Sequence, residues 1–251
     1  DVMGFATFTT FVVTSQAVGR ELSMRVYVPP GVEQAPILYL LHGRDSAPDD
    51  WLRRTHLLEL LPPLPIAVAC LVGENSFYTN LFDGQGNWED SLLAEQIPAI
   101  ERHFWVGGGR ERRVIAGLSM GGFGAFKAAL KRSEHFCAAY STSGAFGATH
   151  DYVSPLKRRV FGPKGASPRQ ENDLFHLARQ LTGPARPTLA FDCGTGDELL
   201  KDNQRFASLL SELGWNYCYT AYSGGHDWSY WDARMPELLA FASFHLQNGP
   251  P

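Results

Sequence analysis

Apolar residues along the chain follow two different patterns, which together predict alternating strands and helices. Residues 36–41 and 66–72 are short and almost wholly apolar, as expected of strands that are buried on both faces of a parallel sheet. Residues 87–104 instead carry apolar side chains at helical spacing, which predicts an amphipathic helix with a kink at Pro98.

This alternation extends over most of the chain. Strand patterns occupy residues 5–18, 21–28, 36–41, 66–72, 113–118, 136–143, 188–193 and 215–222. Helix patterns occupy residues 49–61, 87–104, 121–131, 199–213 and 236–246. The order predicts an α/β fold with a mostly parallel, doubly wound central sheet and helices on both faces. No linker, repeat or low-complexity tract interrupts the chain, so we expect residues 1–251 to form one domain.

The alternation lapses between residues 145 and 185, where basic residues, prolines and glycines are mixed. Within this segment, residues 174–180 have a helical pattern, and Asn172 and Asp173 are suitable N-cap residues for it. Two interpretations remain open. The segment is an insert that forms a lid or a pocket wall, or it is a surface connection between strands.

Composition narrows the classes of function. Of the 251 residues, 44% are hydrophobic and 19% are charged, which suffices for a large core and excludes disorder. The net charge of −4 gives no electrostatic reason to expect a nucleic acid or an anionic membrane as partner. No apolar run reaches the roughly 18 residues of a membrane-spanning helix. We therefore expect a globular protein with a small-molecule partner, and leave open whether it forms a homo-oligomer.

The four cysteines show neither a C-x-x-C pair nor the spacing of metal ligands. Cys70 and Cys218 lie in strand-like apolar runs, where a free thiol acts as a small hydrophobic residue. This usage favours a reducing compartment and predicts a cytoplasmic protein. An even number of cysteines also allows one disulfide, and a secretion signal removed ahead of residue 1 would leave no trace.

The most informative stretch is residues 114–122, in which Gly117 and Gly121 flank Ser119 in a G-x-S-x-G pattern. An apolar strand precedes the serine and a helix follows it, which is the context that a nucleophile elbow requires. The turn is so tight that only very small residues fit two positions before and after the serine. Ser119 is therefore the predicted nucleophile.

A serine nucleophile needs a base to take its proton and an acid to orient that base. His226 lies in a glycine-rich loop after the strand-like residues 215–222, where the base is expected. The other histidines lie in helix-like segments, in the irregular segment or upstream of the serine. For the acid we favour Asp197, in the turn after strand 188–193, over Asp192 inside that strand. Asp197 is also suited to cap the following helix.

An acyl-transfer site also needs donors for the oxyanion. The backbone N–H of Met120, directly after the nucleophile, and that of Arg44, in the loop after strand 36–41, are the expected pair. Aromatic side chains near these segments are candidates for the substrate pocket, with core packing as the alternative for each. The candidates are Trp228, Tyr78 and Trp231.

No cofactor or metal is indicated. Residues 117–124 are glycine-rich and follow a strand, but they do not form a clean G-x-G-x-x-G dinucleotide motif. The chain contains neither a Walker motif nor an H-E-x-x-H motif.

Taken in order, the motifs resemble those of the putative-esterase family of α/β-hydrolases. The matching stretches are Leu40-Leu41-His42-Gly43, Glu74-Asn75-Ser76-Phe77-Tyr78, Gly117-Leu118-Ser119-Met120-Gly121-Gly122, Asp192-Cys193-Gly194-Thr195-Gly196-Asp197 and Gly224-Gly225-His226-Asp227-Trp228. The family includes S-formylglutathione hydrolases, feruloyl and acetylxylan esterases, short-chain carboxylesterases and mycolyltransferases. The resemblance implies the α/β-hydrolase fold, a Ser119–Asp197–His226 triad and oxyanion donors at Arg44 and Met120. The sequence departs from the family at residues 44–46 and over residues 145–185.

Three functions follow from these residues. The first is hydrolysis of carboxylic esters with small acyl groups through an acyl-enzyme. The second is transfer of the acyl group to an alcohol or sugar acceptor, which would use the same residues. The third is non-catalytic binding on a hydrolase scaffold, which predicts a lost triad member although all three positions are filled.

Overall fold

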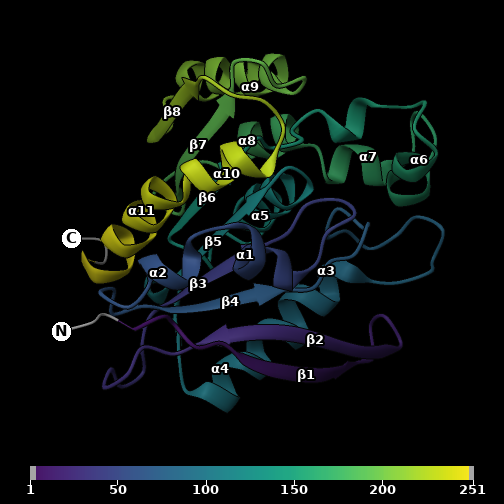
Figure 1. The fold of residues 1–251 in the computed structure, drawn as a ribbon. Helices are drawn as coiled ribbons and strands as arrows, with labels where there is room; N and C mark the ends of the chain where they lie inside the picture. The colour runs from purple at the N-terminus through teal and green to yellow at the C-terminus, as the bar shows by residue number, and fades with distance from the viewer. Residues whose placement is uncertain (1–3, 249–251) are drawn as a thin grey trace.

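An eight-stranded sheet forms the centre of the molecule in the computed structural model, which describes residues 4–248 (Figure 1). The strands are β1 (Thr9–Ser15), β2 (Arg20–Tyr27), β3 (Ile37–Leu41), β4 (Ala67–Leu71), β5 (Arg113–Leu118), β6 (Ala138–Thr142), β7 (Thr188–Gly194) and β8 (Tyr217–Tyr222). Their order in the sheet is β1-β2-β4-β3-β5-β6-β7-β8. Among these strands the β1–β2 and β2–β4 pairs are antiparallel and the other five are parallel, so the predicted mostly parallel sheet is confirmed.

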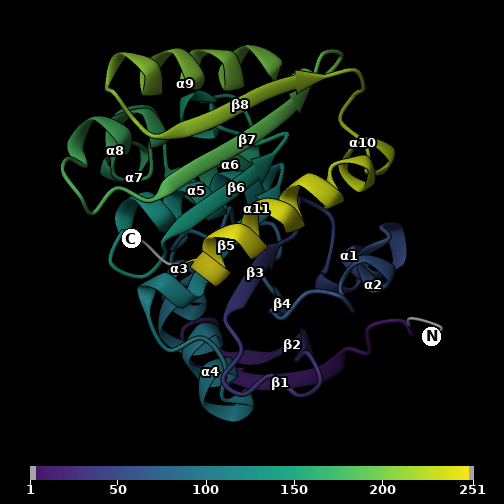
Figure 2. The ribbon, with the colours of Figure 1, turned by 90° about the vertical axis from the view of Figure 1, so that its left-hand side faces the viewer.

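Helices cover both faces of this sheet, as predicted. They are α1 (Pro48–Arg54), α2 (Leu57–Leu60), α3 (Trp88–Asp90), α4 (Ile97–Phe104), α5 (Met120–Lys131), α6 (Pro155–Phe161), α7 (Ser167–Glu171), α8 (Leu174–Gln180), α9 (Leu200–Glu212), α10 (Trp228–Ala233) and α11 (Met235–Asn248). Helices α1, α2, α10 and α11 pack on one face, and Figure 2 shows α11 crossing it. The apolar side chains of α3, α4, α5, α8 and α9 belong to the core on the other face.

Strand β3 shows why the sequence folds into layers. All five of its side chains are fully buried, because alternate residues point into two separate cores. Ile37, Tyr39 and Leu41 belong to the core beside α5, whereas Leu38 and Leu40 belong to the core beside α11. Full burial of each leucine or isoleucine contributes about 1.5–3 kcal/mol relative to exposure. The continuous apolar run is thus the signature of a strand covered on both sides.

The structure differs from the predicted helix 87–104. Residues Ser91–Gln96 form a π-helical turn ahead of α4, in which the Ile97 N–H bonds to the Leu92 carbonyl five residues back. Pro98 lies in the first turn of α4. A proline in a helix cannot supply the usual hydrogen bond to the carbonyl four residues earlier, and the wider turn before it accommodates this loss.

Helices α6, α7 and α10 were not predicted. Helix α10 begins directly after the glycine-rich loop that carries His226. Asp227 is its N-cap residue, and the Asp227 carboxylate accepts a hydrogen bond from the Tyr230 N–H at 3.0 Å. This contact, more than helix propensity, explains why the aromatic-rich sequence is helical.

The irregular segment of residues 145–185 contains α6, α7, α8 and a short 3₁₀ turn at Ala148–His150. Asp173 caps α8 through the Phe175 N–H, as the sequence predicted. Helices α6 and α7 project beyond the sheet on the side where the parallel strands end (Figure 1). Phe161 of α6 packs on Phe77 in the loop after β4, at 5.6 Å between ring centroids. Ligands of doubly wound sheets bind at such an edge.

We expect Gly121→Ala to destabilise the protein by about 3 kcal/mol, because backbone atoms would have to move. A β-carbon at position 121 would lie only 2.0 Å from the carbonyl oxygen of Leu41. Gly109→Ala is the matched control, since a β-carbon there meets nothing within 4 Å and φ is −178°. Urea unfolding of both variants measures the difference. Equal effects of the two substitutions would contradict the packing argument.

Candidate active site

The turn between β5 and α5 holds Ser119 in a strained backbone conformation, with φ 53° and ψ −116°. The turn closes so tightly that a β-carbon on Gly117 would lie 2.3 Å from the backbone of Gly121. A β-carbon on Gly122 would lie 2.3 Å from the Ser141 hydroxyl oxygen. The strain and the close contacts present the Ser119 side chain at the strand end, as the G-x-S-x-G pattern predicts.

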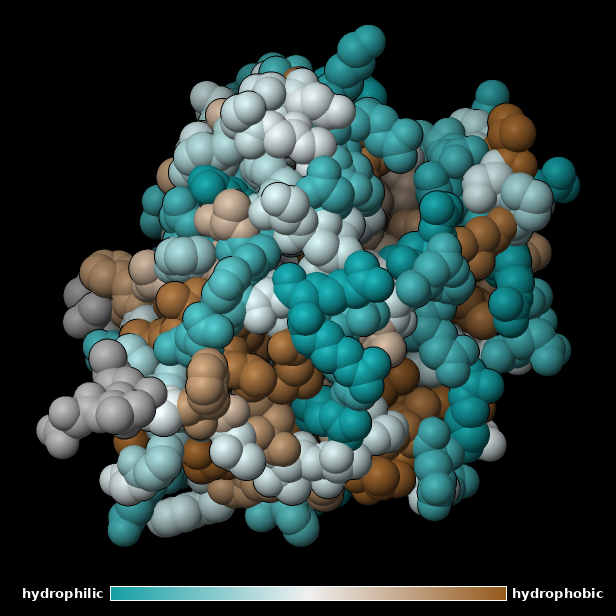
Figure 3. All heavy atoms as spheres, in the orientation of Figure 1, coloured by the Kyte–Doolittle hydropathy of each residue, from teal (hydrophilic) through white to brown (hydrophobic). Residues whose placement is uncertain are grey.

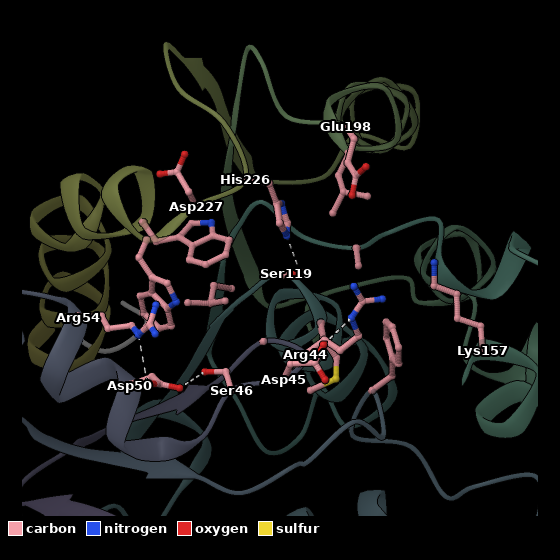
Figure 4. A pocket seen from close by; sticks show the side chains of 18 residues that line it. Arg44, Asp45, Ser46, Asp50, Arg54, Ser119, Lys157, Glu198, His226 and Asp227 are labelled. Carbon is pink, nitrogen blue, oxygen red and sulfur yellow. Dashed lines mark hydrogen bonds and ion pairs between the residues drawn. The ribbon is translucent and has the colours of Figure 1, made fainter. Parts of the chain in front are cut away.

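The structure brings Ser119, His226 and Asp197 into one hydrogen-bonded chain. Figure 4 shows the contact between Ser119 and His226. The Nε2 atom of His226 lies 2.9 Å from the Ser119 Oγ, and its Nδ1 atom lies 2.8 Å from Asp197 Oδ2. The Asp197 side chain is fully buried, whereas the His226 side chain is 27% exposed. This is the geometry by which a carboxylate orients a base towards a hydroxyl group.

The second carboxylate oxygen of Asp197 accepts a hydrogen bond from the Leu199 N–H at 2.8 Å. The capping role considered from sequence therefore coexists with the contact to His226, because each role uses a different oxygen. Burial alone would raise the pKa of Asp197, but the hydrogen bonds from His226 and Leu199 outweigh it and lower that pKa. Asp197 is thus held in its charged form next to the imidazole ring.

Asp192, the alternative acid, is hydrogen-bonded to other side chains and not to His226. It is 1% exposed within β7, and its carboxylate accepts hydrogen bonds from the hydroxyl groups of Tyr140, Thr142 and Tyr230 at 2.6–2.8 Å. Burial raises the pKa of Asp192, against the effect of these hydroxyl groups. The carboxylate fastens neighbouring strands to α10, which assigns Asp192 a structural role.

The two expected oxyanion donors both border the nucleophile. Met120 is the first residue of α5, and Arg44 follows β3. No acceptor for either backbone N–H is found within residues 4–248. The loop reaches the serine because position 43 lacks a side chain. A β-carbon on Gly43 would lie 2.7 Å from Leu118 Cδ1 and 3.5 Å from Ser119 Cβ.

His42 fixes the base of this loop. The residue is 1% exposed, its Nδ1 lies 2.8 Å from the Gly43 carbonyl oxygen, and its Nε2 accepts the Gly73 N–H at 3.1 Å. Only a neutral ring with its proton on Nδ1 can make both hydrogen bonds. Burial lowers the pKa of His42 to about 4, which keeps the ring neutral. His42 thus joins the loop after β3 to the loop after β4.

A cavity of about 410 Å³ opens over Ser119 and His226. The surface is hollowed on the side of α6 and α7 (Figure 3). Figure 4 shows Arg54 and Asp227 on one side of the Ser119–His226 pair, and Arg44, Glu198 and Lys157 on the other. The cavity is lined by Gly43, Arg44, Asp45, Ser46, Asp50, Arg54, Phe77, Leu118, Ser119, Met120, Ala145, Lys157, Glu198, Leu199, His226, Asp227, Trp228 and Trp231.

Two of the three aromatic candidates from sequence line this cavity, and one does not. Trp228 and Trp231 do, and the Trp231 ring packs edge-on against the His226 ring at 5.0 Å between centroids. The prediction for Tyr78 is wrong. Its side chain is fully buried, and its hydroxyl donates to the His42 carbonyl at 2.9 Å. The neighbouring Phe77 lines the cavity instead.

Several cavity residues were not found from sequence. Ala145 and Lys157 belong to the segment of residues 145–185, so part of that segment forms a wall. Lys157 forms an ion pair with Asp151 on the same segment, at 2.9 Å. Leu199 and Glu198 directly follow the acid. Of these residues, only Glu198 and Leu199 could have been predicted from sequence, because residues next to Asp197 must lie near the site.

Within residues 4–248, no group of three His, Cys, Asp or Glu side chains is placed to hold a metal ion. All four cysteines are free thiols. None of the helices in this range has the length and apolar character to span a membrane.

The family model described as putative esterase matches residues 15–242, and the chain belongs to this family. An acetyl esterase of Caldicellulosiruptor saccharolyticus is 30% identical over 224 residues, which cover 84% of each chain. The esterase Rv1288 of Mycobacterium tuberculosis is 33% identical over 150 residues, which are 55% of this chain and 32% of that protein.

Solved structures of serine hydrolases have the same fold as this chain. The fluorophosphonate-binding serine hydrolase FphF of Staphylococcus aureus superposes with a TM-score of 0.85 at 25% identity, covering 96% of this chain and 99% of that one. The S-formylglutathione hydrolase FrmB of the same organism gives 0.82 at 25% identity, covering 94% and 98%. The predicted α/β-hydrolase fold is confirmed, and the protein is a carboxylesterase-type serine hydrolase.

His42 makes the stability of the protein depend on pH. The unfolded ring has its ordinary pKa of 6.5, whereas the folded ring has a pKa of about 4. Between these values the unfolded chain binds the extra proton, so the free energy of unfolding falls as the pH is lowered. The fall due to His42 is about 3 kcal/mol from pH 6.5 to 4.

A glutamine side chain cannot titrate, so we expect His42→Gln to lose this component of the pH dependence. Denaturant unfolding of both proteins at several pH values between 7 and about 4 measures the difference. Parallel stability curves for the wild type and the variant would show that His42 is not the responsible group.

Proposed function

We propose that this protein hydrolyses carboxylic esters of small acyl groups through an acyl-enzyme on Ser119. The observation that carries the proposal is the hydrogen-bonded chain from Asp197 through His226 to Ser119. A serine hydroxyl is unreactive until a base removes its proton, and His226 lies at the distance required to do so.

In the first step, Ser119 Oγ attacks the carbonyl carbon while its proton passes to His226 Nε2. The carbonyl oxygen becomes an oxyanion, which the Met120 and Arg44 N–H groups bind. Asp197 stabilises the resulting imidazolium through Nδ1. Collapse of the intermediate breaks the bond to the alcohol, which leaves with the proton from Nε2. A water molecule, activated by the same histidine, then releases the acid and regenerates Ser119.

The walls of the cavity suggest where each part of the substrate binds. The alcohol must leave near His226, because that ring donates its proton, and Trp231 packs against the same ring. Trp228 adjoins Trp231 at 5.2 Å between centroids. We therefore place the alcohol portion against these two indoles. The acyl group then lies on the side of Phe77, which packs on Phe161 of α6.

Two observations favour a small acyl group and hydrolysis over transfer. The cavity volume of about 410 Å³ is near the lower end of the range for ligand pockets, and both parts of the ester must share it. The 27% exposure of the His226 side chain means that water can reach the base for the second step. An enzyme that transferred the acyl group would need to exclude this water.

A series of p-nitrophenyl esters from acetate to long acyl chains tests the proposal. We expect the highest kcat/KM at acetate or butyrate, and a loss of kcat of about 10⁴-fold or more in Ser119→Ala. Addition of alcohol or sugar acceptors should not divert the acyl group from water. A transesterified product in their presence would favour a transferase, and wild-type turnover in Ser119→Ala would refute the role of Ser119.

The two candidate acids can be separated by a pair of matched variants. We expect Asp197→Asn to lower kcat by about 10³–10⁴-fold, because the amide cannot stabilise the imidazolium charge. In Asp192→Asn the buried hydroxyl groups lose a charged acceptor, and the free energy of unfolding should fall by about 1–3 kcal/mol. Steady-state kinetics and urea unfolding are measured for both variants. A larger kcat loss in a folded Asp192→Asn would reverse the assignment.

A further inference from the structure

A lysine lies buried in the helix that follows the nucleophile. Lys127 is 1% exposed, and burial lowers its pKa to about 8 although Glu89 acts in the opposite direction. A buried ammonium group costs several kcal/mol unless it is paired and fully hydrogen-bonded. The reaction proposed above does not use this charge, so its location calls for another explanation.

All three donors of the ammonium group are satisfied, and two of them bind one turn of the chain. The Nζ of Lys127 lies 2.6 Å from the Tyr78 carbonyl oxygen and 2.8 Å from Thr79 Oγ1. The third contact is to Glu89 Oε2 at 2.7 Å. Lys127 thus fastens the turn after β4 to the helix that begins beside the nucleophile.

That turn is strained. Phe77 and Tyr78 have φ values of 53° and 52°, in the left-handed region that side chains other than glycine disfavour. Such a conformation costs about 1–2 kcal/mol per residue and persists only when its surroundings hold it. The Lys127 ammonium, on the Tyr78 carbonyl, is the only charged group that bonds to the backbone of these two residues within residues 4–248.

The turn supports the site on two sides. Phe77 lines the cavity and packs between Phe123 and Phe161 at 5.7 and 5.6 Å between centroids. Tyr78 points the other way and bonds through its hydroxyl to the carbonyl of His42, beneath the oxyanion loop. A displacement of the Phe77–Tyr78 backbone would therefore change the cavity wall and the support of the loop together.

We propose that Lys127 is a positioning residue: by holding the Phe77–Tyr78 turn, it sets the length of the acyl chain that the enzyme accepts. The selectivity part of the proposal rests on the proposed ester hydrolysis. The claim that Lys127 holds the Phe77–Tyr78 turn does not rest on ester hydrolysis, and it can be tested without an activity assay.

The test compares Lys127→Met with Lys131→Met. Lys131 also pairs with Glu89, at 2.8 Å, but it is 25% exposed, and no contact to the Phe77–Tyr78 turn is found for it within residues 4–248. We expect Lys127→Met to raise the ratio of kcat/KM for octanoate over acetate about tenfold. The ratio in Lys131→Met should stay within about twofold of the wild type.

Hydrogen exchange gives the readout that is independent of activity. Amide exchange across residues 73–81 should accelerate in Lys127→Met and not in Lys131→Met. If exchange there is unchanged, Lys127 does not hold the turn and the proposal is wrong. If exchange accelerates but the chain-length ratio does not move, the turn does not set selectivity and the proposal is also wrong. A wild type without ester turnover would instead refute the proposed function, and exchange would still decide the role of Lys127.

A milder variant covers the case in which Lys127→Met does not fold. Thr79→Val removes an acceptor of Lys127 and the hydrogen bond that Thr79 Oγ1 donates to the Phe77 carbonyl at 3.0 Å. We expect it to shift the chain-length ratio and the exchange of residues 73–81 in the same direction, by a smaller factor. An unshifted ratio in this variant contradicts the proposal.

Discussion

The absence of side chains at positions 117 and 121 is the constraint on which the site geometry depends. A β-carbon at either position would collide with backbone, at 2.3 Å within the turn and at 2.0 Å from the end of β3. Because both are absent, α5 begins directly against the sheet and Ser119 stands at the strand end. The same approach places the Met120 N–H next to the loop that carries Arg44. The positions of the proposed oxyanion donors thus follow from a packing requirement.

A second layer of buried polar groups holds the loops around this turn. His42 bonds to the loops after β3 and β4, Tyr78 supports the first loop, and Lys127 anchors the second to α5. Each group is costly to bury, and each is fully engaged. The sheet itself is held by apolar contacts on both faces. Polar groups are concentrated where loops without regular hydrogen-bonding ladders must keep a fixed shape.

The sequence predicted the features that depend on local pattern. The buried strands, the turn at Ser119 and the loop of His226 all follow from short motifs in the right context. The choice between Asp192 and Asp197 depended on where β7 ends, and the pairing of Asp192 with Thr220 places the former inside the sheet. Residue patterns along a chain do not fix the end of a strand to within one residue.

Other features depend on contacts between distant segments. Tyr78 was a candidate cavity residue, whereas Phe77 lines the cavity. In a turn with two consecutive left-handed residues, neither strand nor helix periodicity tells which side chain faces inward. A lysine in a helix is expected in solvent, and the burial of Lys127 arises from partners that lie 38 and 48 residues away. Such positions become apparent only when the chain is folded.

The long separation in sequence between Ser119 and the proposed base, His226, has a consequence for how the protein matures. His226 follows the serine by 107 residues, and it comes after β8, which pairs with β7 at the edge of the sheet. A chain that has emerged only as far as β6 holds Ser119 but neither Asp197 nor His226. The proposed mechanism therefore requires synthesis of the edge strand β8 and of the loop after it.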